Sequence, residues 1–143
     1  MRSPGAPDRV VVSDGSYTES VFGYSRAVRV GDFISVAGTT AMAPDGPIGG
    51  AEIGEQTREC LRRIEGALER AGARLTDVVR TRVFVTEIAS WRDVGRVHRE
   101  VFAAALPATT IVEIARLFDP RLLVEIEADA IAPVERAGSS LER

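Results

Sequence analysis

The segment Glu55–Ala71, EQTRECLRRIEGALERA, is the part of the sequence that decides the fold most clearly. Gly72 follows it, at the position where a glycine commonly ends a helix because it adopts the left-handed backbone conformation without strain. The apolar side chains recur at intervals of three and four residues, the spacing of one helix face: Cys60, Leu61, Ile64, Ala67, Leu68 and Ala71. The segment therefore predicts an amphipathic helix.

A β-hairpin is expected before this helix. Ser25–Val30 and Phe33–Ala37 are short segments rich in residues that favour strands, and the turn-forming pair Gly31-Asp32 separates them. Residues 43–50 are then dominated by Pro, Gly and Asp, which favour turns over regular structure. The fold is expected to open with two paired strands, followed by an irregular link into the helix.

The pattern changes again after the first helix. Leu75–Val85 predicts a strand, and the apolar spacing over Trp91–Phe102 predicts a second helix with Ser90 at its N-cap. Thr109–Ala115 and Leu122–Ala132 are rich in β-branched residues and alternate apolar with polar side chains. These two segments predict the final strands.

The order of elements is strands, helix, strand, helix, strands. This order predicts an α+β fold in which two helices pack on one face of a mixed β-sheet. A chain of 143 residues is long enough to bury one core, so residues 1–143 are expected to form a single domain. The two ends, residues 1–8 and 136–143, are rich in small, turn-forming and polar residues and are expected to be flexible.

Composition excludes several classes of function. All 18 basic residues are arginine, so a lysine Schiff base and a P-loop lysine are both excluded. The net charge of -3 offers no general attraction to a polyanion, which argues against nucleic acid as a partner. Cys60 is the single cysteine, no apolar segment resembles a signal peptide, and no apolar run approaches the roughly 20 residues that span a bilayer. We therefore expect a cytoplasmic protein with no membrane partner.

Several segments of the chain, in order, resemble one known family. They are Gly23–Val28, Ile34–Gly38, Glu55–Arg58, Asp77–Val85, Val112–Leu117 and Val124–Ala128. Together they resemble the Rid family, also called YjgF-type, which includes imine and enamine deaminases. The resemblance implies a homotrimer whose ligand clefts lie between neighbouring subunits, so that the chain itself is one of its partners.

The resemblance also implies roles for particular residues. In the imine-deaminase branch, a tyrosine of an early segment lines the cleft, a glutamate of the last strand positions or activates water, and an arginine in the segment P-A-R-S binds the substrate carboxylate. Tyr24 and Glu125 match the first two. Thr109 stands at the position of the arginine, and a neutral hydroxyl cannot replace a charged pair whose hydrogen bonds contribute about 1.5 to 3 kcal/mol each. The cleft is then expected to take an uncharged ligand, or one whose carboxylate another arginine binds.

The predicted site combines these matches with their neighbours. Glu125 is the predicted catalytic residue, and the predicted substrate-binding residues are Tyr24, Gly38, Thr39, Thr109 and Thr110. No metal and no organic cofactor is implied. Two structural interpretations stay open: Glu125 could lie with Glu127 and Asp129 on a solvated strand face, and Tyr24 could simply cap the sheet.

Three further residues are interpreted as structural. His98 lies at the edge of the apolar face of the second helix and is expected to pack or to lie at the surface. Cys60 lies within the first helix and is expected to be a small core or boundary residue. Arg116 is expected to form an ion pair with Glu113 or with a neighbouring subunit.

The leading functional hypothesis is a hydrolase or tautomerase that adds water to a small imine, enamine or related metabolite. The alternative is a noncatalytic trimer that binds a small ligand or regulates, and Thr109 favours it. A ribonuclease or translation inhibitor is less favoured, because the chain is acidic, has no lysine and has a single histidine.

Overall fold

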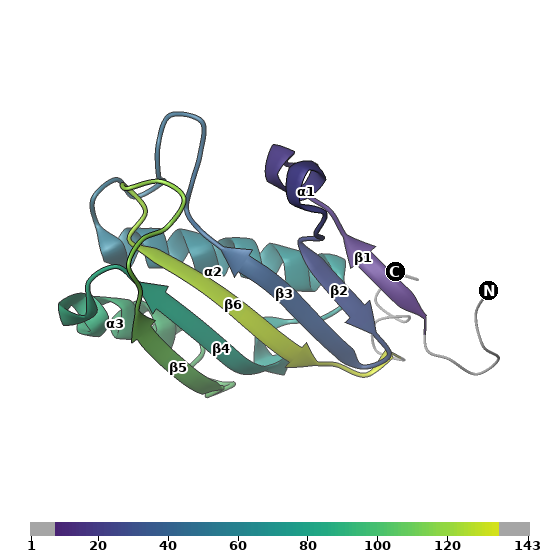
Figure 1. The fold of residues 1–143 in the computed structure, drawn as a ribbon. Coiled ribbons are helices and arrows are strands. Elements are labelled where there is room, and N and C mark those ends of the chain that lie inside the picture. Colours follow the sequence, from purple (N-terminus) through teal and green to yellow (C-terminus); the bar gives the residue numbers. More distant parts are fainter. Residues whose placement is uncertain (1–7, 135–143) are drawn as a thin grey trace.

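The computed structural model describes residues 8–134, which form a six-stranded sheet with two long helices behind it (Figure 1). The strands are β1 (Arg9–Val12), β2 (Ala27–Val30), β3 (Phe33–Thr39), β4 (Val78–Val85), β5 (Ala108–Glu113) and β6 (Val124–Ile131). Their order across the sheet is β1-β2-β3-β6-β4-β5. Every neighbouring pair is antiparallel except β4 and β5, which are parallel, so the sheet is mixed as expected.

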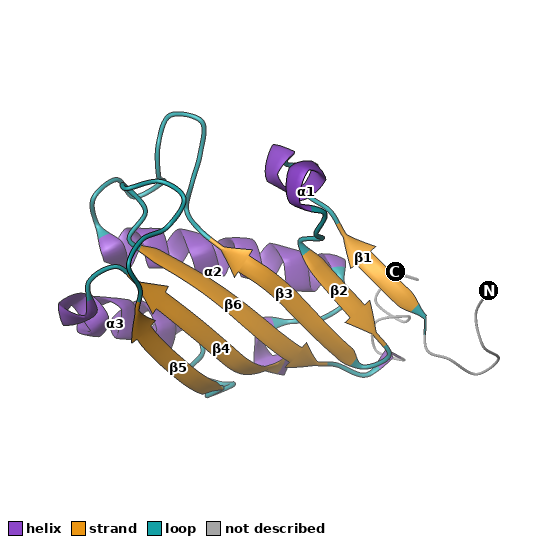
Figure 2. Cartoon of the chain, in the orientation of Figure 1, coloured by secondary structure: helices purple, strands orange, loops and turns teal. Residues whose placement is uncertain are grey.

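Two long helices cover one face of this sheet, as Figure 2 shows. The helices are α1 (Tyr17–Phe22), α2 (Ile53–Arg70) and α3 (Trp91–Val101), with single 3-10 turns η1 (Leu75–Asp77) and η2 (Ile88–Ser90). The covering helices are α2 and α3, which confirms the predicted α+β fold. Gly72 has a φ of 82°, in the left-handed region, just after α2 ends.

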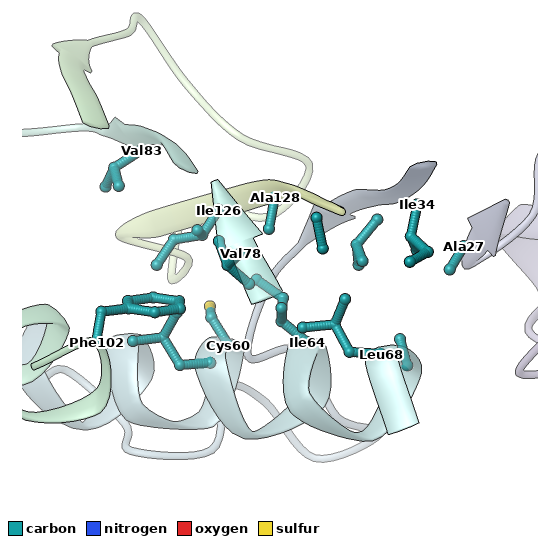
Figure 3. Close-up of a cluster of buried hydrophobic side chains, with 14 of the residues drawn as sticks. Ala27, Ile34, Cys60, Ile64, Leu68, Val78, Val83, Phe102, Ile126 and Ala128 are labelled. Carbon is teal, nitrogen blue, oxygen red and sulfur yellow. The ribbon is translucent and has the colours of Figure 1, made fainter. Parts of the chain in front are cut away.

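The core fills the space between these helices and the sheet (Figure 3). Ile64 and Leu68 of α2 lie against Ile34 of β3 and Ile126 of β6, and all four side chains have no exposed surface. Each side chain of this size stabilises the fold by about 1.5–3 kcal/mol when it is fully buried. Burial alternates along β6, so that every second residue points away from the helices.

The other face of the sheet is not covered by α2 or α3 and is partly polar. Arg82 of β4 forms ion pairs of 3.2 Å with both Glu127 and Asp129 of β6. Ser35 of β3 donates a hydrogen bond of 2.7 Å to Asp129. Glu127 and Asp129 are therefore half-buried and belong to a polar network across three strands. Alternation along the strand alone suggests that they would be freely solvated.

Two elements were not expected from the sequence, and one began late. Strand β1 and helix α1 precede the predicted hairpin, and β1 pairs along the whole of β2. The strand predicted from Leu75 begins only at Val78, because Asp77 accepts a hydrogen bond of 2.8 Å from the Arg74 backbone N–H and closes the turn η1.

Two further predictions can be compared with the described residues only in part. The predicted flexible ends, residues 1–8 and 136–143, lie outside the described residues except for Asp8. Within residues 8–134, no helix is both long and apolar enough to span a membrane.

Candidate functional site

Glu125 lies on β6, on the face of the sheet that α2 and α3 leave open, and its side chain is half-buried. Gly38 of β3 faces it: a Cβ added there would lie 2.8 Å from the Glu125 Oε1 atom. Gly38 therefore leaves the space that the carboxylate occupies. Burial raises the pKa of Glu125 above its usual value, against the lowering effect of Arg26, and the charge of Glu127 raises it a little more. The carboxyl group is thus biased towards holding a proton.

Arg26 brings a positive charge to the same place, although the sequence analysis gave it no role. Its Nη2 atom donates a hydrogen bond of 2.5 Å to the carbonyl of Gly38. Its guanidinium lies 5.9 Å from the centre of the Tyr24 ring. The Nε atom is buried and has no hydrogen-bond partner. Arg26 and the half-buried Val28 are two residues apart and share one side of the extended chain, opposite the buried Ala27. This spacing was the signal in the sequence that Arg26 faces the open side.

Tyr24 reaches this place through α1. Gly23 ends the helix with a φ of 80°, and the backbone N–H groups of Gly23 and Tyr24 both donate to the carbonyl of Glu19, at 2.8 and 3.3 Å. The Tyr24 hydroxyl lies 2.9 Å from the hydroxyl of Thr18. The ring is therefore held at the border of the site by an element that the sequence analysis missed.

The N-terminal end of α1 is fixed by polar contacts of its own. Ser16 is the N-cap, and its hydroxyl accepts a hydrogen bond from the backbone N–H of Glu19. The Glu19 carboxylate accepts bonds from Ser13 Oγ at 2.6 Å and from the backbone N–H of Gly15 at 3.2 Å. The spacing Ser16-x-x-Glu19 is a helix-start signature, and it could have revealed α1 from the sequence.

Thr39 follows Gly38 but turns its side chain away from the open face. Its side chain is 1% exposed, and the hydroxyl donates a hydrogen bond of 2.8 Å to the carbonyl of Ala37. Any contact between Thr39 and a ligand would come from its backbone. Its predicted role in binding stays a prediction.

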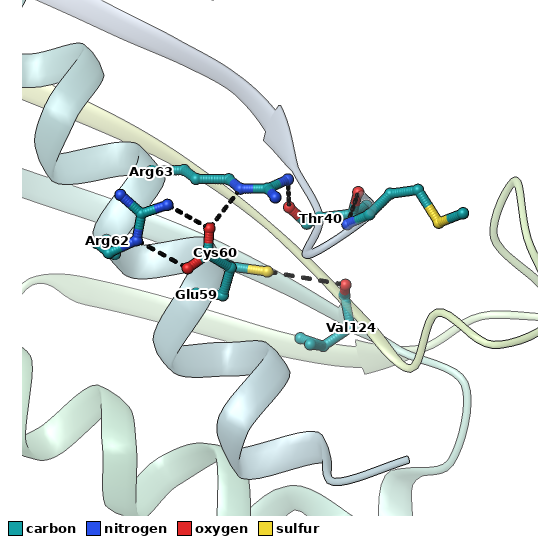
Figure 4. A network of polar contacts seen from close by, with 7 residues as sticks. Thr40, Glu59, Cys60, Arg62, Arg63 and Val124 are labelled. Carbon is teal, nitrogen blue, oxygen red and sulfur yellow. Dashed lines mark hydrogen bonds and ion pairs between the residues drawn. The ribbon is translucent and has the colours of Figure 1, made fainter. Parts of the chain in front are cut away.

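The chain just beyond Thr39 is held from the helix layer (Figure 4). Arg63 of α2 donates from Nη1 to the carbonyl of Thr40 at 2.8 Å, and from Nε to the Glu59 carboxylate at 2.7 Å. Arg62 also binds Glu59, and this hydrogen bond is the largest cause that holds the pKa of Glu59 below its usual value. The network fixes the end of β3, and with it the backbone beside Glu125.

Thr109 lies elsewhere, on β5 at the edge of the sheet. Its hydroxyl donates to the carbonyl of Pro107 at 3.1 Å and lies 2.7 Å from the hydroxyl of Thr81, which in turn lies 2.9 Å from the Nε2 atom of His98. A hydroxyl has one proton, and the carbonyl can only accept. Thr81 therefore donates to Thr109, and His98 Nε2–H donates to Thr81. Thr109 has no proton left to offer a ligand.

The predicted site residues thus fall into two groups within one chain. Tyr24, Gly38 and Glu125 lie together around Arg26, over β2, β3 and β6. Thr109 and Thr110 lie on β5, with β4 between that strand and β6. Thr110 pairs with Arg82 of β4 and is exposed. One chain does not bring all the predicted residues together.

A shallow hollow borders the first group on the open face. It is lined mainly by Tyr24, Ser25, Ser35, Ala37, Arg82 and Asp129. Glu125 does not line it, although Tyr24 belongs both to the hollow and to the group around Arg26. The hollow extends the polar surface of the site towards β4.

The residues interpreted as structural have mixed outcomes. Cys60 is fully buried, its Sγ atom lies 4.0 Å from the carbonyl of Val124, and burial raises the pKa of its thiol to about 12, so its core role is confirmed. The His98 ring packs on Phe102 with centroids 4.7 Å apart, and burial lowers the pKa of His98.

The predicted ion pair between Arg116 and Glu113 is wrong. The Glu113 carboxylate instead accepts a hydrogen bond of 3.0 Å from the backbone N–H of Ile88, because β5 runs beside the turn that follows β4. Arg116 is exposed, and its pairing with a neighbouring subunit stays a prediction.

Comparisons with known proteins give a consistent result. The family model described as Endoribonuclease L-PSP matches residues 16–132. A crystal structure of a member of the YjgF/YER057c/UK114 family from Mycobacterium tuberculosis is 54% identical, with a TM-score of 0.81 over 87% of this chain and 100% of that one. A putative endoribonuclease from Thermotoga maritima is 30% identical, with a TM-score of 0.71 over 85% of this chain and 91% of that one. The 2-iminobutanoate/2-iminopropanoate deaminase of Escherichia coli is 31% identical over 112 residues, 76% of this chain and 86% of the relative.

Proposed function

Because the chain belongs to the endoribonuclease L-PSP family, the YjgF/RutC/Rid superfamily, we propose that it hydrolyses a small imine or enamine by adding water. The observation that carries this proposal is the half-buried Glu125 carboxyl group, which faces the bare Gly38 and has its pKa raised by burial. Such a group can take a proton from water and return it. Some relatives carry the deaminase name, which supports the reaction class.

The proposed reaction requires few protein groups beyond the Glu125 carboxyl group. A protonated imine has an electrophilic carbon, and an enamine reaches the same state by taking a proton on carbon. Glu125 accepts a proton from water as the oxygen bonds to that carbon. The carboxyl group then returns the proton to the nitrogen. As the C–N bond breaks and ammonia leaves, the Glu125 carboxylate takes the proton of the new hydroxyl group, which becomes the carbonyl of the product. A carboxyl group with a raised pKa suits both directions of this transfer.

We also propose that the working protein is a homotrimer. Several apolar side chains are exposed at separate places: Tyr17 and Phe22 of α1 are each 81% exposed, Leu106 before β5 is 78% exposed, and Phe118 after β5 is 94% exposed. Exposed apolar side chains at different places on one chain suit a head-to-tail contact, which closes into a ring when the rotation permits. Such a contact would carry Thr109 and Thr110 of one subunit towards Glu125 of the next.

A specific observation favours a second candidate, a trimer that binds a ligand without turnover. Thr109 occupies the position of the family's carboxylate-binding arginine, and its hydroxyl proton is already bonded to Pro107. A site that lost its anchor could retain binding and lose catalysis. The name endoribonuclease belongs to the family and to some neighbours, and the net charge of -3 argues against an RNA substrate here.

Ammonia release separates these candidates. Imines are generated freshly by an amino-acid oxidase, and their hydrolysis is followed with the wild type and with Glu125→Gln, which keeps the shape of the side chain and loses its proton transfer. Acceleration by the wild type and not by the variant supports the hydrolase. Thermal stabilisation of both proteins by metabolites, with no acceleration by either, supports the ligand-binding trimer instead.

A further inference from the structure

We propose that Arg26 is the residue that binds the anionic group of the ligand, in place of the arginine that Thr109 replaces. The proposal names the substrate class of the proposed function and rests on it for the reaction, although not for the binding. The ligand is then a small imine or enamine that carries a carboxylate, as opposed to a neutral one.

The charge of Arg26 is not neutralised by a contacting carboxylate of the described residues. A guanidinium has five N–H donors, and a single hydrogen bond to the Gly38 carbonyl is formed here. Among residues 8–134, no carboxylate forms an ion pair with Arg26. Asp14 and Glu125 feel its charge, since Arg26 lowers the pKa of each, but they do so from beyond ion-pair distance.

Arg26 is also held in place and partly shielded from water. The Gly38 carbonyl fixes one edge of the guanidinium, and the Tyr24 ring lies within the range of a cation–π contact. The buried Nε atom without a partner is a cost that native structures rarely leave unexplained. A ligand oxygen that draws the guanidinium a little towards the site would relieve it. Arg26 is thus a preorganised cation that lacks an anion.

Gly38 contacts both Arg26 and Glu125. Its carbonyl holds Arg26, and the space left by its missing side chain takes the Glu125 carboxylate. A carboxylate bound by Arg26 therefore brings the adjacent imine carbon towards the group that handles water. Because Arg26 and Glu125 form no ion pair, each stays available for its own part of the ligand.

Thr109 cannot take this role. Its proton is given to the Pro107 carbonyl, and the chain from His98 through Thr81 holds that arrangement. The remaining lone pair of Thr109 repels a carboxylate and accepts only from a donor. The anion-binding function is therefore assigned to Arg26, directly before β2, and not to β5.

Binding of 2-oxobutanoate tests the proposal, since this anion is the hydrolysis product of a carboxylated imine, and butanone is a neutral probe of similar size. Calorimetric titration compares the wild type with Arg26→Gln and with Arg96→Gln, a matched control on the exposed side of α3. We expect 2-oxobutanoate to bind Arg26→Gln at least about tenfold more weakly than the wild type and the control. Butanone should bind all three proteins alike.

Kinetics give a second readout that a merely structural role would not move. For carboxylated imines, KM should rise at least about tenfold in Arg26→Gln, and by a larger factor than it rises for neutral imines. Arg26→Lys keeps a cation and should restore part of the affinity, which also guards against a Gln variant that fails to fold. Equal binding of 2-oxobutanoate by the wild type and both Arg26 variants, or no binding by the wild type, overturns the proposal.

The two proposals fail separately. Arg26-dependent binding of 2-oxobutanoate without ammonia release would leave the anion site standing and remove the hydrolase. Glu125-dependent ammonia release that is unaffected in Arg26→Gln, with a carboxylated imine, would leave the hydrolase standing and remove the anion site.

Discussion

At the scale of single residues, the site combines two groups whose burial or lack of a partner is unfavourable for folding, which indicates a functional role. Glu125 is a carboxyl group that burial makes harder to ionise, and Arg26 forms no ion pair with a carboxylate of the described residues. The sequence indicated Glu125 and Tyr24 through their places in family segments. The sequence did not indicate Arg26. Whether a guanidinium forms an ion pair depends on which carboxylates the fold brings near it.

Glu125→Gln should stabilise the protein at neutral pH while it removes activity. The raised pKa means that the folded state favours the protonated carboxyl group. That contribution is therefore complete below the ordinary pKa of 4.5 and is lost as the pH rises through the raised value. Glutamine stays neutral throughout, so the variant should gain stability over the wild type at pH 7.5 and match it more closely at pH 4. Urea unfolding at both values measures this, and a variant less stable than the wild type at pH 7.5 would contradict it.

At the scale of elements, strong periodicity was a reliable guide and short elements were not. The hairpin of β2 and β3, the helices α2 and α3, and the last two strands are confirmed. All of these except β5 have a buried face that the sequence pattern shows. Strand β1 has four residues, of which only Val12 is buried, and α1 has six residues. Neither is long enough for a periodic pattern, although the Ser16-x-x-Glu19 signature marks where α1 begins.

The contact between β3 and β6 predicts the effect of Gly38→Ala. The new Cβ would meet the end of the flexible Glu125 side chain, which can move, so we expect a change of less than about 1 kcal/mol in the free energy of unfolding. The carboxylate would nevertheless be displaced from its place. Gly66→Ala is the control: nothing lies within 4 Å of its Cβ, and helix α2 should gain about 0.5–1 kcal/mol. Thermal unfolding of both variants measures these changes, and collapse of Gly38→Ala would show that Gly38 is needed for the fold itself.

At the scale of the whole molecule, the predicted site does not lie within one chain. Thr109 and Thr110 lie on the edge strand β5, whereas Glu125 lies on β6 beside β3. Sequence patterns predict strands but not their order across a sheet, so this separation could not be predicted from periodicity. The resemblance to a family with clefts between subunits is the basis of our proposal that assembly brings the two groups together.

Sedimentation equilibrium measures the assembly. We expect a species of three chains, because a head-to-tail contact between the exposed apolar side chains of α1 and those that flank β5 can close a ring. Leu106→Glu replaces one of these apolar side chains with a charge and should weaken the trimer and ammonia release together. A monomeric wild type, or a monomeric Leu106→Glu variant with full activity, would contradict the assembly.

The central claim is that Glu125, in the space left by Gly38, adds water to an imine. The most direct measurement is the initial rate of ammonia release from freshly generated imines at pH 7.5 for the wild type, Glu125→Gln and Gly38→Ala. The account predicts acceleration by the wild type, none by Glu125→Gln and a strongly reduced rate with folded Gly38→Ala. Equal rates for all three proteins, or no acceleration by the wild type with any imine, would contradict it.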